Sequence, residues 1–142
     1  MYNIGFNLGD PFNEGHGMTK TFHIQANHSV EEITEAYKKA SKKLGWNYLT
    51  TICDEYDDSS INLEQIEDIE KKLNISIKES LSKWQKEDLE HDEYCYLDTV
   101  NFVDIFFAIV SSEIPDFKWN EIDFNEHTLY LLDGAGYGLF SH

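Results

Sequence analysis

The sequence predicts a single α+β domain. We expect one antiparallel sheet, formed by an N-terminal hairpin and C-terminal strands and packed by about four helices. Three observations predict it. Apolar and polar residues alternate near both ends of the chain, which is typical of half-buried strands. Between the ends, apolar residues recur at helical spacing. The length of 142 residues is close to the commonest size of one domain, so residues 1–142 are predicted to fold as one unit.

The N-terminal hairpin is predicted from two alternating segments, residues 2–8 and residues 19–26. Between them, residues 9–17 are rich in turn-forming types and predict a long connection. His23 falls on the polar face of the second segment, where we expect it to be exposed.

The first helix is predicted to begin at Ser29 and to stop at Gly45. Ser29 and Glu32 have the spacing of a capping box, and glycine is a common C-terminal stop. Leu49 to Cys53 is a short apolar run that predicts a strand.

Three further helices are predicted from apolar residues at helical spacing. Residues 63–73 define the second helix, and Ile77, Leu81 and Trp84 define the third. The fourth begins at Asp98 or Thr99 and runs to about residue 112. Apolar residues nearly encircle the fourth helix, so we expect it to be the buried central helix of the domain.

The C-terminal part is predicted to supply the remaining strands. Pro115 ends the fourth helix, and alternating apolar residues over 117–124, 128–132 and 137–140 predict three strands.

The net charge of −16 limits the kinds of partner. All 11 basic residues are lysine, against 27 acids. Arginine is the usual residue for bidentate phosphate contacts, and phosphate contacts dominate affinity for nucleic acids. We therefore expect no direct binding to DNA or RNA, and an anionic membrane surface should repel the protein.

The negative charge is concentrated in the second part of the chain. Residues 1–53 hold five acids and five lysines, whereas residues 54–142 hold the other 22 acids and six lysines. Such an asymmetry predicts an acidic surface on one side of the molecule. The acids at the end of the third helix oppose the helix dipole, which favours a functional acidic surface over dispersed charge for solubility. The predicted partner-binding residues are Asp54, Glu55, Asp57, Asp58, Glu64, Glu67, Asp68, Glu87, Asp88, Glu90, Asp92 and Glu93.

Neither a secretory signal nor a membrane-spanning run is visible, and two cysteines are too few for a disulfide framework. The sequence thus predicts a cytoplasmic protein with reduced thiols.

No catalytic motif is recognisable, and we predict that the protein is not an enzyme and needs no cofactor. A metal site at His16 with Asp10 and Glu14, joined by His23 and His28 if strand geometry allows, lacks the usual motifs. A calcium loop starting at Asp54 fails at three of the positions that such a loop requires, two ligands and the glycine of the turn. His91 and Cys95 would share a face if their segment were helical, but acidic neighbours should suppress the thiolate.

Three segments together resemble a group of small uncharacterised acidic proteins of Gram-positive bacteria and their phages. They are Gly15 to Phe22, Ser29 to Tyr37 and Gly136 to Phe140. The resemblance implies a prokaryotic or phage setting and carries over no catalytic residue.

The sequence favours a stoichiometric inhibitor that binds a basic protein through its acidic surface. The expected partner is a nuclease or another nucleic-acid-binding effector, blocked by a phage anti-defence protein. One alternative is an immunity protein against a nuclease toxin. Another is a small-ligand sponge or sensor, whose pocket would be lined by Trp46, Trp84, Trp119 and the tyrosines.

Overall fold

The computed structural model describes residues 1–9, 20–52, 59–122, 128–133 and 140–141. The strands are β1 Tyr2–Gly9, β2 Lys20–Ala26, β3 Ser59–Asn62, β4 Tyr94–Leu97, β5 Trp119–Glu121, β6 Thr128–Asp133 and β7 Phe140–Ser141. The helices are α1 Val30–Leu44, α2 Tyr48–Ile52, α3 Leu63–Leu73, the 3-10 helix η1 Lys78–Ser80, α4 Lys83–Asp92 and α5 Thr99–Ser111.

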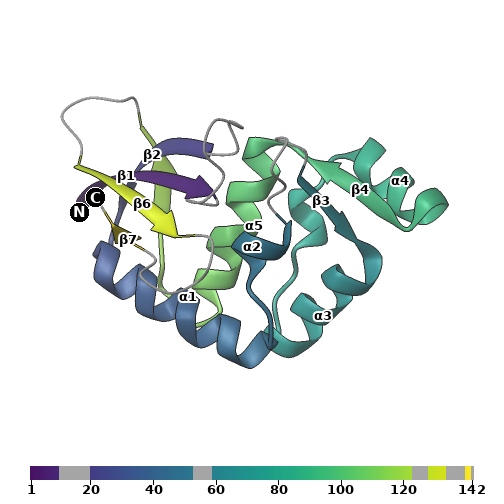
Figure 1. The fold of residues 1–142 in the computed structure, drawn as a ribbon, viewed down its shortest axis with the longest axis horizontal. Coiled ribbons are helices and arrows are strands. Elements are labelled where there is room, and N and C mark those ends of the chain that lie inside the picture. Colours follow the sequence, from purple (N-terminus) through teal and green to yellow (C-terminus); the bar gives the residue numbers. More distant parts are fainter. Residues whose placement is uncertain (10–19, 53–58, 123–127, 134–139, 142) are drawn as a thin grey trace.

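Both ends of the chain contribute to one five-stranded sheet in the order β5-β2-β1-β6-β7 (Figure 1). β1 and β2 form the predicted antiparallel hairpin, in which Ile4 lies opposite Ile24. The predicted α+β architecture, with an N-terminal hairpin and C-terminal strands in one sheet, is therefore confirmed. One pairing differs, because β6 runs parallel to β1. Parallel neighbours need a long crossover connection, and the helices between β1 and β6 provide it.

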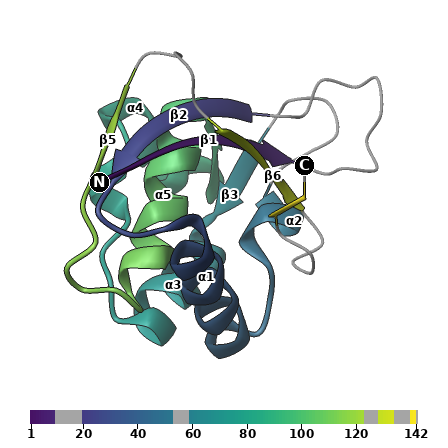
Figure 2. The same cartoon turned by 90° about the vertical axis from the view of Figure 1, so that its left-hand side faces the viewer.

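The helices α1 and α5 lie on the same face of this sheet (Figure 2). A second, two-stranded sheet pairs β3 with β4 in antiparallel register, with Ile61 opposite Cys95. The helices α3 and α4 accompany this small sheet, at the end of the molecule away from both termini (Figure 1). The chain thus places its acidic helices far from the hairpin that begins it.

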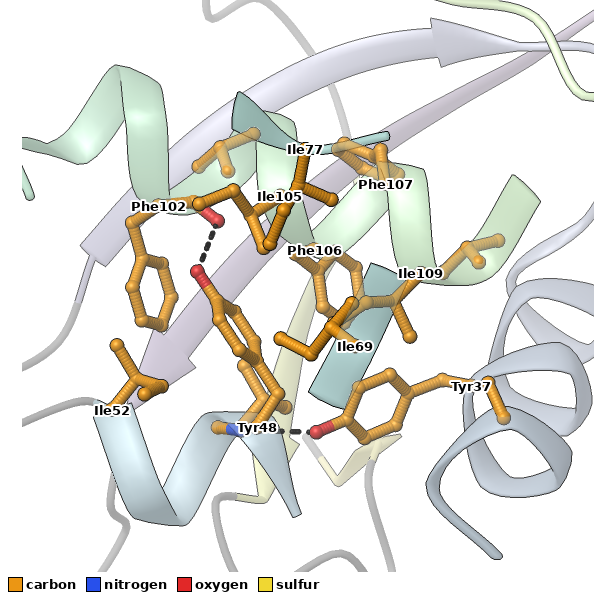
Figure 3. Close-up of a cluster of buried hydrophobic side chains, with 14 of the residues drawn as sticks. Tyr37, Tyr48, Ile52, Ile69, Ile77, Phe102, Ile105, Phe106, Phe107 and Ile109 are labelled. Atoms are coloured by element: carbon orange, nitrogen blue, oxygen red, sulfur yellow. Dashed lines mark hydrogen bonds between the residues drawn. The ribbon is translucent and has the colours of Figure 1, made fainter. Parts of the chain in front are cut away.

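The central position predicted for α5 is confirmed. Phe102, Phe106 and Ile109 on this helix are completely buried. Tyr37 of α1 and Tyr48 of α2 each pack a ring at 5.1 Å from a phenylalanine of α5, on Phe106 and Phe102 respectively (Figure 3). Burying one phenylalanine side chain contributes about 1.5–3 kcal/mol, so these contacts stabilise the α1, α2 and α5 arrangement strongly.

The two tyrosine hydroxyl groups in this core are hydrogen-bonded. Tyr48 Oη donates to the carbonyl oxygen of Phe102 at 3.0 Å, and Tyr37 Oη accepts from the amide of Leu49 at 3.0 Å (Figure 3). Tyr37 Oη also donates to Asn47 Oδ1 at 2.7 Å. Burial raises the pKa of Tyr37 far above its ordinary value. A buried hydroxyl needs such partners, and here they fix α2 against α1 and α5.

The predicted ends of α1 are confirmed. The hydroxyl of Ser29 accepts from the amide of Glu32 and the Glu32 side chain returns to the Ser29 amide, so the capping box is closed. Gly45 ends the helix with a φ of 89°, in the left-handed region that glycine adopts without strain.

Three local predictions were wrong. The run from Leu49 to Cys53 was expected to be a strand, but α2 ends at Ile52, and buried Tyr48, Leu49 and Ile52 have helical spacing. Ile77, Leu81 and Trp84 were expected to define the third helix, but α4 begins only at Lys83, after Ile77 and Leu81. Its buried residues are Gln85 and Leu89, and Trp84 is 54 % exposed.

His23 was expected to be exposed and is half-buried. Its strand β2 lies between β1 and β5, and its carbonyl oxygen accepts a hydrogen bond from the amide of Ile122 at 2.9 Å. Neighbouring strands on both sides therefore limit its contact with solvent.

Candidate functional site

The eight predicted acids that fall within the described residues are carried by α3 and α4. Glu64, Glu67 and Asp68 belong to α3. The others lie on α4 or cap it, and they are Glu87, Asp88, Glu90, Asp92 and Glu93. The remaining four, Asp54, Glu55, Asp57 and Asp58, lie outside the described residues.

Side-chain caps set where each acidic helix begins. Asn62 Oδ1 accepts from the amide of Gln65 at 2.7 Å, and Gln65 Oε1 accepts from the amide of Asn62 at 2.9 Å. Ser82 and Gln85 form the same reciprocal cap at the start of α4. Such capping boxes satisfy backbone donors that have no partner inside a helix, so both helix starts are fixed by local sequence.

A buried amide network holds α4 against the rest of the domain. Gln85 is completely buried. Its Nε2 donates to Asn101 Oδ1 on α5 at 2.6 Å and to the carbonyl oxygen of Tyr96 on β4 at 2.8 Å. Asn101 Nδ2 donates in turn to the carbonyl oxygen of Ser80 at 2.6 Å. Because buried polar groups are costly unless they are paired, this network fixes the position of α4.

Pairing of β3 with β4 joins the beginning of α3 to the end of α4. The amide of Leu63, the first residue of α3, donates to the carbonyl oxygen of Glu93 at 2.8 Å. A surface hollow at this junction is lined by Leu63, Glu64, Glu67 and Glu93. The structure therefore brings together acids that are almost 30 residues apart in the sequence.

Glu67 also lines a second hollow between the two helices, together with Glu90, Leu89, Lys78 and Lys86. We call Glu64, Glu67, Glu90 and Glu93 the acidic groove. All four side chains are exposed. The two lysines at its border reduce the local charge without occupying the hollow shared by Glu64, Glu67 and Glu93.

Asp68 has a different environment from the acidic groove. Its Oδ2 accepts from Trp46 Nε1 at 2.7 Å, and its Oδ1 lies 3.2 Å from Lys72 Nζ. The Trp46 hydrogen bond, followed by the contact with Lys72, lowers the pKa of Asp68. These contacts already engage the carboxylate, so Asp68 serves to attach α3 to the segment after α1.

Asp88 and Asp92 lie on the other flank of α4, beside β4. Residues four apart share one side of a helix, and both carboxylates help to raise the pKa of Tyr94, whose largest cause is its hydrogen bond with Tyr96. Glu87 is exposed on the same helix. The predicted acids on α4 thus divide between two flanks, one facing α3 and one facing β4.

The end of α4 has an unusual backbone for its sequence. Glu93 caps the helix with a φ of 66°, in the left-handed region that favours glycine. Acids at this end also oppose the helix dipole. The left-handed backbone of Glu93 and the acidic charge at the helix end both lower local stability. This agrees with the interpretation that the acids at the end of α4 are kept for function.

The arrangement of His91 and Cys95 that would suit nucleophilic chemistry is not formed. Its premise was one helix carrying both residues, but α4 ends at Asp92 and Cys95 lies on β4. Cys95 is buried, and burial, together with the charge of Asp88, raises the pKa of its thiol to about 11. Thiolate is the reactive form, so Cys95 is inert at neutral pH.

The exposed aromatic residues beside α4 were missed by the sequence reasoning. Tyr94 and Tyr96 are 43 % and 51 % exposed, on the outer face of β4. A signal was available, because Tyr94 to Leu97 alternates between polar-tipped and apolar residues, with Cys95 and Leu97 buried. Four residues are too short a run to distinguish a strand from a frayed helix end.

The three tryptophans proposed for a ligand pocket lie on separate parts of the fold. Trp46 lines a hollow with Thr51, Lys71 and Lys72. Trp84 is exposed on α4, whereas Trp119 on β5 packs against Phe107 at 4.5 Å. They do not line one common hollow among the described residues.

Among the described residues, no three His, Cys, Asp or Glu side chains are grouped so as to hold a metal ion. The candidate ligands His16, Asp10 and Glu14 lie outside the described residues. No helix in the described part of the chain is long and apolar enough to cross a membrane.

Comparisons with known proteins found no matching family model, no matching curated protein and no matching solved structure.

Proposed function

We propose that this protein is a non-enzymatic, stoichiometric inhibitor that binds a basic protein through its acidic face. The partner is a nuclease or another nucleic-acid-binding effector. One observation carries the proposal: α3 and α4 meet so that the exposed acids Glu64, Glu67, Glu90 and Glu93 line two adjoining hollows that share Glu67. The two helices are consecutive α-helices of the chain. The pairing of β3 with β4 brings the start of α3 to the end of α4 and so concentrates their negative charge.

The physical basis is electrostatic. With a net charge of −16, the protein attracts basic surfaces over long distances, which raises the association rate and makes the affinity sensitive to salt. Nucleases line their substrate channels with lysine and arginine, which bind phosphate. A row of exposed carboxylates can occupy such a channel in place of phosphates, and it would then exclude the nucleic acid.

Two biological roles share this mechanism. A phage protein would block a host defence nuclease, and an immunity protein would block a nuclease toxin. We favour the phage anti-defence role, in a cytoplasmic setting, because of the resemblance to small acidic proteins of Gram-positive bacteria and their phages. The identity of the neighbouring gene distinguishes the two roles.

The test is capture of partners from a bacterial host lysate at low salt and again at about 0.5 M salt, where the screening length falls to a few Å. We expect basic proteins to be retained only at low salt. The nuclease activity of a captured enzyme should then fall in proportion to added protein and vanish at one equivalent.

Charge-reversed variants separate the acidic groove from net charge. Glu64→Lys, Glu67→Lys and Glu90→Lys, combined, should weaken capture. The matched control reverses three exposed acids elsewhere, Glu31 and Glu35 on α1 and Glu121 on β5. It changes the net charge by the same amount and should weaken capture much less. A second variant reverses the charges of residues 54–58. The acidic-surface mechanism is wrong if capture is indifferent to salt and to all of these reversals.

A further inference from the structure

The flank of α4 opposite the acidic groove presents exposed aromatic residues. Trp84 is 54 % exposed on the first turn of α4, and Tyr94 and Tyr96 are 43 % and 51 % exposed on β4. The two tyrosine rings make an edge-on contact, with centroids 5.7 Å apart and planes at 84°. Burying Cys95 and Leu97 on the inner face of β4 forces the tyrosines outward, because neighbouring side chains on a strand point to opposite faces.

Helix α4 lies beside strand β4. The hydrogen bond from Gln85 Nε2 to the carbonyl oxygen of Tyr96 places the first turn of α4 beside Tyr96. Trp84, Asp88 and Asp92 follow each other at intervals of four residues, so they share a side of the helix. We call Trp84, Asp88, Asp92, Tyr94 and Tyr96 the aromatic face.

The carboxylates of this face act electrostatically on Tyr94. Asp92 and Asp88 both raise the pKa of Tyr94, after the larger effect of its hydrogen bond with Tyr96, and Asp88 also acts on Cys95. Aromatic rings attract cations over their faces, and carboxylates pair with the same cations through charge-assisted hydrogen bonds. Tyrosine and tryptophan are also the residues that most often dominate binding energy at protein interfaces.

The charge of the molecule decides between possible occupants. A second copy of this chain carries the same charge of −16, so two aromatic faces would meet with strong repulsion. An anionic membrane is repelled for the same reason. A protein segment with exposed arginine or lysine matches both the carboxylates and the rings.

We propose that the aromatic face is the anchor of the interface, and that it binds an arginine- or lysine-bearing segment of the basic partner protein. The inference rests on the proposed function and adds to it the chemistry of recognition. The acidic groove attracts the partner over a distance, and the aromatic face supplies the short-range contacts that hold it. Figure 1 shows α4 and β4 at the end of the molecule away from both termini, where a partner can approach.

The test uses the full chain and a short peptide of alternating arginine and glycine. Binding is followed by NMR, through the indole N–H of Trp84 and the backbone amides of residues 94–96. We expect shifts confined to the aromatic face, and a smaller response to a matched lysine peptide, because guanidinium stacks on aromatic rings better than ammonium does. A peptide with citrulline in place of arginine has the same shape without the charge, and it should not bind.

The aromatic variants are Tyr94→Leu with Tyr96→Leu, and separately Trp84→Ala. The matched control is Tyr2→Leu, because Tyr2 is 48 % exposed on the distant strand β1. All of these positions are exposed, and retained melting temperatures show that each variant is folded. We expect each aromatic variant to lose about tenfold in affinity for the arginine peptide, the scale of an interface hot spot. The Tyr2 variant should bind like the wild type.

Failure of this inference differs from failure of the proposed function. Suppose that the aromatic variants bind the arginine peptide like the wild type, while reversal of Glu64, Glu67 and Glu90 weakens capture of basic proteins. The aromatic anchor is then wrong, and the proposal of an acidic binding surface stands. Equal binding of the citrulline peptide overturns the cation requirement. If the aromatic variants leave peptide binding unchanged and the acidic variants leave capture of basic proteins unchanged, both proposals are wrong.

Discussion

At the scale of single residues, His28 is held between two carboxylates. Its Nδ1 lies 3.0 Å from Glu32 Oε2 on α1, and its Nε2 lies 3.2 Å from Asp116 Oδ1, just before β5. Both ring nitrogens donate only in the protonated form. The hydrogen bond with Glu32, and then that with Asp116, raises the pKa of His28 against the opposing effect of burial. The protonated ring therefore ties the start of α1 to the segment that leads into β5.

This geometry predicts a pH-dependent contribution to stability. Since the folded-state pKa of His28 lies above its unfolded value, the contribution is complete below pH about 6.5. It is lost as pH rises through the raised folded value. Urea unfolding of the wild type and of His28→Asn should therefore differ at pH 5.5 and converge at pH 9. His91→Asn, at an exposed position on α4, is the matched control. An equal difference in the free energy of unfolding at both pH values would show that protonated His28 does not tie the start of α1 to the segment before β5.

At the scale of elements, the end of α4 offers a test of strain. Glu93 adopts a φ of 66°, which glycine tolerates better than glutamate. We expect Glu93→Gly to stabilise the protein by about 0.5–1 kcal/mol, measured by urea unfolding. Glu93→Gln separates the loss of charge at the helix end from the change in backbone freedom.

Asn74 provides the control for this prediction, since it caps α3 with a φ of 55°. Asparagine adopts the left-handed region more readily than glutamate, so Asn74→Gly should gain less than Glu93→Gly. If Glu93→Gly destabilises the protein, the Glu93 side chain contributes to folding and its placement is no sign of function.

The longer elements could be predicted from sequence, whereas the shorter ones could not. Helix α1 has both a capping box and a glycine stop, and α5 has a long apolar surface, so local signals define them. Helix α2 and strand β4 contain five and four residues, which is too few periods to separate a helix from a strand. Their form is decided by tertiary packing instead, as when α2 buries Tyr48 and Ile52.

The candidate site was predicted in composition but not in arrangement. The sequence indicated that acids gather after residue 53. It could not show that Asp68 accepts a hydrogen bond from Trp46, or that Glu67 lies near Glu93. The proximity of Glu67 to Glu93 depends on pairing between β3 and β4, which are separated by α3, η1 and α4 in the chain. The alternation over Tyr94 to Leu97 is too short a local pattern to identify strand β4, so the exposure of Tyr94 and Tyr96 was also missed.

At the scale of the whole molecule, one charge distribution acts on folding and on binding in opposite ways. A net charge of −16 on 142 residues makes the folded state repel itself, because folding brings the acids closer together. The acidic groove adds to this repulsion, since Glu64, Glu67 and Glu93 border a single hollow. Dissolved salt screens these interactions over about 8–10 Å at physiological ionic strength. Salt should therefore stabilise the fold while it weakens the complex with a basic partner.

The last prediction compares these two effects of salt in the same protein. Thermal unfolding between about 0.02 and 0.5 M sodium chloride should show a melting temperature that rises with salt. The combined variant Glu64→Lys, Glu67→Lys and Glu90→Lys should melt higher at low salt and respond less to added salt, because the repulsion is already relieved. Its capture of basic partners should be weaker under the same conditions. The variant that reverses Glu31, Glu35 and Glu121, three exposed acids outside the groove, controls for net charge alone. If the groove variant melts lower than the wild type at low salt, the groove acids stabilise the fold. The groove would then not be a surface that is kept for binding at the expense of stability, and weaker capture by the variant would not support that interpretation.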